Sequence, residues 1–149
     1  MQPERLKTVL KWFLKADKDL LVALISFPEG PVLQEEIGFH CQQAIEKYLK
    51  GLLLFENVKP PRTHQLEVLL NLLEHTNIFG SADFEIAVKL ESFAVRLRYP
   101  LELEDDEVRE LRGSINDVIS IRKKVMNYCQ LPLESKLLDK RLTEHGFNF

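Results

Sequence analysis

The sequence has few of the residues on which several classes of protein depend. It contains two cysteines, one tryptophan and six glycines among 149 residues. With so little glycine it has no glycine-rich phosphate loop, P-loop or nucleophile elbow. Cys41 and Cys129 show no Cys-x-x-Cys or His-Glu-x-x-His spacing and fall on apolar helical stripes. We therefore expect two buried thiols and no metal site.

Long apolar runs and an excess of positive charge are also missing. No run reaches the ~18 residues that span a bilayer, and residues 1–5 lack the apolar core of a signal peptide. We therefore expect a cytoplasmic protein with no membrane partner. The net charge of -3 argues against a broad basic surface for nucleic acid, although a local basic patch is compatible with it.

Helical periodicity is what the chain has in quantity. Apolar residues make up 45% of it and recur at steps of three and four, with no lasting strand alternation. The pattern predicts helices over about 3–27, 33–55, 63–73, 82–97 and 108–129, and a short one over 133–142. Thr63 is the expected N-cap of the third. These lengths favour an all-α, antiparallel (up-and-down) bundle of four to five main helices over residues 1–130, with a short C-terminal extension over 131–149.

Polar residues beside the apolar stripes are the first candidates for a site. Asp17 interrupts the stripe of the first helix, and Arg122 interrupts that of the last long helix. His40, Gln43 and Lys47 share one side of the second helix, and an antiparallel first helix would bring Asp17 to them. Two interpretations stay open. One is a structural polar network that sets helix register, and the other is a nucleotide or phosphate pocket made from His40, Lys47 and a nearby arginine.

A second candidate lies at the end of the fourth helix. Arg96, Arg98 and Tyr99 come just before Pro100, which stops the helix. Arginines there interact favourably with the helix dipole. Alternatively, a guanidinium and a phenol presented at a helix end bind a phosphate or a base.

Three stretches together resemble one family. They are FHCQQAIEKYLKGLL at residues 39–53, PPRTH at 60–64 followed by Leu66, and LRYP at 97–100. The opening RLKTVLKWFLKADKDLLVA, with Asp17 and Asp19, agrees with them. In order and spacing these stretches resemble the HEPN domain (higher eukaryotes and prokaryotes nucleotide-binding domain), of the prokaryotic stand-alone type. The resemblance covers residues 5–129.

The resemblance implies a helical bundle that forms a homodimer and often pairs with a minimal nucleotidyltransferase encoded next door, in toxin–antitoxin or related systems. It implies a nucleotide or RNA as the ligand and no other cofactor. The candidate nucleotide- or partner-binding residues are then Asp17, His40, Gln43, Lys47, Arg98 and Tyr99. Tyr99 is also a candidate site for nucleotide attachment by the transferase.

The sequence departs from the family where many members carry a ribonuclease motif. That motif is an arginine, four to six residues, and then a histidine. Arg98 matches the arginine, but positions 103–105 hold leucine, glutamate and aspartate, and starting from Arg96 does not supply a histidine either. RNA cleavage without metal needs a group that moves a proton near neutral pH, and acidic residues repel a phosphate backbone. We therefore assign no catalytic residue and predict no ribonuclease activity by the standard mechanism.

Two other functions remain as alternatives. One is a divergent metal-independent ribonuclease that uses Arg98 at a dimer interface, with His40 or His64. The other is a structural homodimer without affinity for nucleotides.

Overall fold

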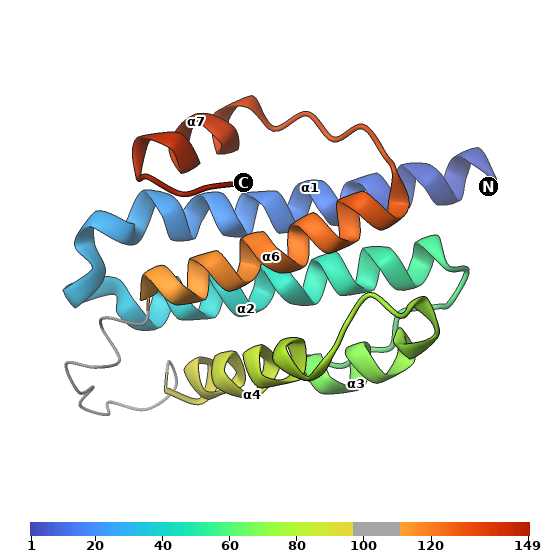
Figure 1. The fold of residues 1–149 in the computed structure, drawn as a ribbon, viewed down its shortest axis with the longest axis horizontal. Helices are drawn as coiled ribbons and strands as arrows, with labels where there is room; N and C mark the ends of the chain where they lie inside the picture. Colours follow the sequence, from blue (N-terminus) through green and yellow to red (C-terminus); the bar gives the residue numbers. More distant parts are fainter. Residues whose placement is uncertain (97–110) are drawn as a thin grey trace.

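The computed structural model describes residues 1–96 and 111–149, and their side chains except at 94–96. Within these ranges the chain is helical and has no strand. The helices are α1 (Pro3–Ser26), α2 (Gly30–Phe55), α3 (Leu66–Leu72), α4 (Ser81–Arg96), α6 (Leu111–Cys129) and α7 (Lys136–Glu144), with 3-10 turns at Phe27–Glu29 and Glu74–Thr76. The predicted all-α bundle is confirmed (Figure 1).

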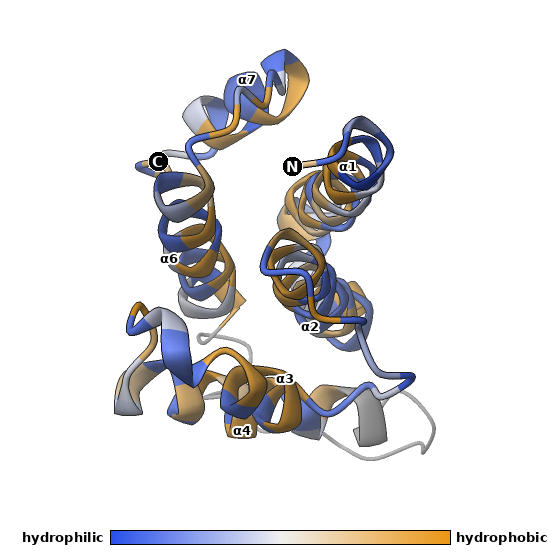
Figure 2. Cartoon of the chain, turned by 90° about the vertical axis from the view of Figure 1, so that its right-hand side faces the viewer, coloured by the Kyte–Doolittle hydropathy of each residue, from blue (hydrophilic) through white to orange (hydrophobic). Residues whose placement is uncertain are grey.

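Helix α2 lies at the centre of the bundle. It runs antiparallel to α1, with which it shares the largest interface, and it also packs against α3, α4 and α6 (Figure 1). In the end-on view the hydrophobic sides of these helices face one another (Figure 2). The helices therefore form because each presents an apolar stripe that another helix covers.

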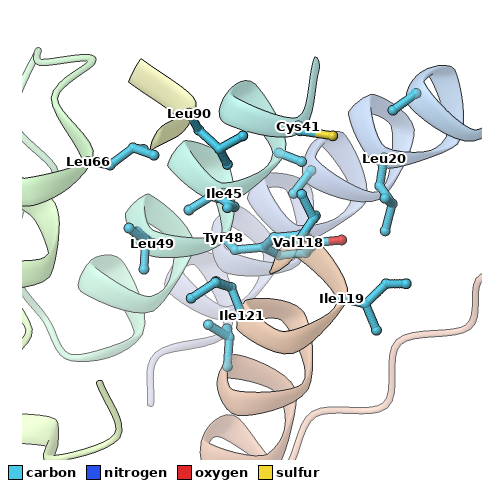
Figure 3. Close-up of a cluster of buried hydrophobic side chains, with 14 of the residues drawn as sticks. Leu20, Cys41, Ile45, Tyr48, Leu49, Leu66, Leu90, Val118, Ile119 and Ile121 are labelled. Atoms are coloured by element: carbon cyan, nitrogen blue, oxygen red, sulfur yellow. The ribbon is translucent and has the colours of Figure 1, made fainter. Parts of the chain in front are cut away.

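The core is made of apolar side chains that the helices bury against one another. Tyr48, Leu49 and Leu52 of α2 are fully buried against Phe13 of α1 and Val118 of α6. In the close-up, the Tyr48 ring lies among these aliphatic side chains while its hydroxyl reaches the edge of the cluster (Figure 3). This hydroxyl therefore needs a polar partner.

The connection between α1 and α2 is tighter than predicted. A single 3-10 turn over Phe27–Glu29 joins the two helices, and α2 begins at Gly30 rather than near Leu33. Pro31 fits the first turn of α2 because its missing N–H has no helical partner there. The predicted start of this helix near Leu33 coincides with a kink in α2, because Leu33 has non-helical angles (φ -111°, ψ 23°).

The start of α3 corrects the prediction for Thr63. The helix begins at Leu66, and Thr63 Oγ1 accepts a hydrogen bond from the N–H of Gln65 at 3.1 Å, which closes a turn before the helix. The N–H of Leu66, which has no partner within α3, donates to the Glu91 carboxylate of α4 at 2.8 Å. A distant side chain therefore caps the helix in place of Thr63.

The last residues fold back over the bundle. Helix α7 packs on α1, and Leu138, Leu142 and Phe147 are buried there (Figure 1). The Arg112 guanidinium lies 4.3 Å from the centroid of the Phe147 ring and donates to the carbonyl of His145 at 2.7 Å. The tail is thus fastened by both apolar and polar contacts.

None of the helices in the described ranges combines the length and the hydropathy that crossing a membrane requires.

The two thiols are free and buried, as predicted. Burial above all, and then the charge of Asp117, raises the pKa of Cys41 from 9.0 to about 12. Burial likewise raises the pKa of Cys129 to about 12.

We expect both cysteines to resist alkylation in the native protein. The thiolate is the nucleophile, and a shift of this size lowers its fraction at pH 8 by about a thousandfold. Iodoacetamide labelling at pH 8, followed by mass spectrometry, should therefore be far slower in buffer than in urea. Equal rates would contradict the burial.

Because the folded pKa lies above the unfolded one, the protonated thiols also contribute stability that is lost as pH rises from about 9 towards 12.

Candidate functional site

Two basic side chains of α2 converge on one carboxylate of α1. Asp19 forms an ion pair with the Lys47 ammonium, and its other oxygen lies 2.9 Å from Nδ1 of His40. His40 and Lys47 are two helical turns apart, so they lie on the same face of α2. The Asp19 side chain is 12% exposed, whereas those of His40 and Lys47 are 29% and 24% exposed. The carboxylate is therefore covered, and the imidazole and the ammonium border solvent.

This arrangement can bind an anion. Asp19 holds both side chains in place, and no other described residue hydrogen-bonds the second ring nitrogen of His40. An incoming phosphate would share the Lys47 ammonium with Asp19 and lie beside the ring nitrogen of His40 that no described residue engages. Charge-assisted hydrogen bonds of this kind are among the strong ones.

A second cluster centres on Asp17 and is buried. The carboxylate accepts hydrogen bonds from Arg122 of α6, through Nε at 2.9 Å and a terminal nitrogen at 3.2 Å. It also accepts the hydroxyls of Tyr48, from α2, and Ser135, from the segment before α7. One carboxylate thus joins α1, α2, α6 and the C-terminal segment.

The electrostatics of this cluster show an ion pair supported by neutral donors. Burial and then the Asp17 charge raise the pKa of Tyr48 well above its ordinary value, so the phenol keeps its proton and donates it. Burial alone would lower the pKa of Arg122, but the hydrogen bond and charge of Asp17 outweigh it and raise this pKa. The arrangement matches the structural network among the two interpretations of Asp17.

The expected meeting of Asp17 with His40 and Lys47 does not occur, and Asp19 takes that place. Residues two apart on a helix point about 200° away from each other. Asp19 therefore faces the polar edge of α2, while Asp17 faces the gap that Arg122 fills.

Gln43 belongs to a third cluster. Its amide donates to Gln42 at 2.8 Å and to Glu46 at 3.3 Å. The buried Glu46 also pairs with Lys50 at 2.8 Å and with Nδ1 of His64 at 3.1 Å. This network fastens the turn before α3 onto α2. In the sequence, the only signal for this network is the spacing of Glu46 and Lys50, which is that of a helical ion pair.

The remaining candidates, Arg98 and Tyr99, lie outside the described residues, as do positions 103–105. Within the described ranges, no three histidine, cysteine, aspartate or glutamate side chains are placed to hold a metal.

The fold and these clusters define a helical-bundle protein with a solvent-bordering polar edge between its first two helices. The family model of the HEPN domain matches residues 9–130, and the chain belongs to this family, whose members are nucleotide-binding and ribonuclease-like. The predicted family is thereby confirmed. Searches of curated proteins and of solved structures gave no match.

Proposed function

We propose that this chain is a binding module that holds a nucleotide and docks a minimal nucleotidyltransferase, as one half of a toxin–antitoxin-type pair. The observation that supports the proposal is the convergence of His40 and Lys47 on Asp19 at the edge of the bundle. The His40 and Lys47 side chains also border solvent, at 29% and 24% exposure, so a ligand can reach them. In this proposal the transferase supplies the catalytic carboxylates and the metal.

The proposal includes a homodimer that does not cleave RNA by the family's standard mechanism. The homodimer rests on the resemblance to the HEPN family, and the absence of cleavage rests on the missing histidine at positions 103–105. An assay with purified protein and single-stranded RNA tests this part. Cleavage that disappears in Arg98→Ala would establish the divergent ribonuclease instead.

The nucleotide part is tested by calorimetry with ATP. We expect the wild-type protein to bind ATP and Lys47→Ala to bind it about 10- to 100-fold more weakly, because a charge-assisted hydrogen bond contributes about 1.5–3 kcal/mol. Lys123→Ala is the matched control, since Lys123 is an exposed lysine of α6 with no ion pair in the described part of the chain.

Three outcomes decide the nucleotide part. Equal affinity of Lys47→Ala and Lys123→Ala would remove the Asp19 cluster from the proposal. Absence of any binding would leave the structural homodimer. Circular dichroism melting of each variant separates lost binding from lost folding.

The docking part is tested by co-expression with the nucleotidyltransferase encoded next door. We expect the two proteins to co-purify through size-exclusion chromatography at a constant ratio. Separate elution at micromolar concentration would count against docking and leave the calorimetric result unaffected.

A further inference from the structure

A row of lysines runs along the exposed face of α1. Lys7, Lys11, Lys15 and Lys18 follow one another at steps of four, four and three, so they lie on one side of the helix. All four are exposed. Lys7 pairs with Glu4 at 3.2 Å, whereas the other three form no ion pair or hydrogen bond within the described residues.

This row is costly for the helix that carries it. Like charges four residues apart destabilise a helix, and no acidic residue occurs between Arg5 and Ala16 to offset them. Within α1 the nearest acidic groups are already paired, Glu4 with Lys7, Asp17 with Arg122 and Asp19 with Lys47. Outside α1, Glu134 shares a hollow with Lys18. A chain with a net charge of -3 therefore keeps uncompensated positive charge at Lys11 and Lys15.

The chain's single tryptophan borders the same strip. Trp12 is partly exposed, and the Lys50 ammonium of α2 lies 5.9 Å from its ring centroid. Thr8, Lys11, Trp12 and Lys15 line a hollow of about 260 Å³. An aromatic ring beside free ammonium groups is the combination that stacks a base and neutralises its phosphates.

We propose that Trp12 together with Lys11, Lys15 and Lys18 binds single-stranded nucleic acid along α1. A base stacks on Trp12 in the hollow, and successive phosphates follow the lysines. The row from Lys11 to Lys18 spans about 10 Å at 1.5 Å per residue, which is longer than one phosphate group, so a strand uses it better than a free nucleotide. This surface shares no residue with the Asp19 cluster, and its test is separate from that of the nucleotide site.

Trp12 is its own reporter, because no other tryptophan contributes to the fluorescence. We expect titration with a 12-nucleotide oligouridine to quench this fluorescence. Three phosphate contacts on a single strand predict a slope of about -2 for log affinity against log salt, hence a loss of roughly 20-fold between 50 and 200 mM salt.

A matched pair of variants isolates the lysines. Lys11→Gln/Lys15→Gln should weaken binding at least tenfold at 50 mM salt and reduce the slope to about -0.7. The control, Lys123→Gln/Lys140→Gln, removes two exposed charges elsewhere and should bind like wild type. Trp12→Leu, followed by the anisotropy of labelled oligouridine, should lose about 5- to 100-fold through the lost stacking.

Four results would overturn the proposal. They are no quenching by oligouridine, equal affinity of the two double variants, displacement of oligouridine from Trp12 at equal concentration by heparin, which has charge but no bases, and equal displacement by a mononucleotide or an acidic peptide. Circular dichroism melts of the variants must match wild type for the comparison to count.

Discussion

Replacing Asp17 by alanine is expected to lower the free energy of unfolding by about 3–5 kcal/mol, because removal of one partner leaves a buried charge without compensation. The Asp17 and Arg122 side chains are only 7% and 15% exposed. Without the carboxylate, the Arg122 guanidinium, the Tyr48 hydroxyl and the Ser135 hydroxyl all lose the acceptor that they share. Because these side chains are largely covered in the folded protein, the groups left without an acceptor destabilise the folded state.

Urea unfolding followed by circular dichroism measures this effect. The control is Asp19→Ala, which removes a carboxylate from the same helix but leaves without a partner two side chains, His40 and Lys47, that already border solvent. Partly exposed pairs contribute little, so we expect this control to cost about 1 kcal/mol or less.

A double variant tests the physical reason. Asp17→Leu with Arg122→Met removes both charges together and should recover much of the stability lost in Asp17→Ala, because well-packed apolar residues often replace a buried pair without loss. If Asp17→Ala costs less than about 1 kcal/mol, the carboxylate does not hold the bundle together as described.

Hydrophobic periodicity predicted most of the fold, for a physical reason. Each long helix buries one stripe, so the stripe appears in the sequence at steps of three and four whatever it packs against. Helices α1, α2, α4 and α6 follow these stripes within the described ranges. The start of α3 was misplaced because its first free N–H is capped by Glu91, 25 residues further along the chain.

Partnership between distant polar residues was harder to predict. The sequence marks Asp17 and Arg122 as anomalies in two separate stripes, but they are 105 residues apart and nothing local joins them. The choice between Asp17 and Asp19 as the partner of Lys47 depends on the rotation of α1 about its own axis. The apolar stripe sets this rotation only approximately. It shows which residues face the core, but it does not show which of two polar residues beside the stripe meets the neighbouring helix.

Two glycines of α2 give the second large effect. A Cβ built on Gly51 would lie 2.5 Å from Cε1 of Phe13 and 3.0 Å from Cβ of Trp12. A Cβ on Gly38 would lie 2.8 Å from Cδ2 of Phe93 and closer still to two other atoms of that ring. Both phenylalanines are buried, at 0% and 2% exposure, so neither ring can swing into solvent. These glycines allow α1 and α4 to approach α2 closely.

We expect Gly38→Ala and Gly51→Ala each to lower the free energy of unfolding by about 1–3 kcal/mol through overpacking. Helix propensity alone predicts the opposite sign, since alanine stabilises a helix interior by about 0.5–1 kcal/mol relative to glycine. Gly113→Ala in α6 is the matched control, because no described atom outside its chain neighbours and the α6 backbone lies within 4 Å of its added Cβ, and it should raise the melting temperature. Gly38→Ala combined with Phe93→Leu should cost less than the sum of the two single changes, because the smaller side chain relieves the contact. A melting temperature of Gly38→Ala or Gly51→Ala above that of wild type would mean that the helices can separate at little cost. The close approach would then be incidental to stability.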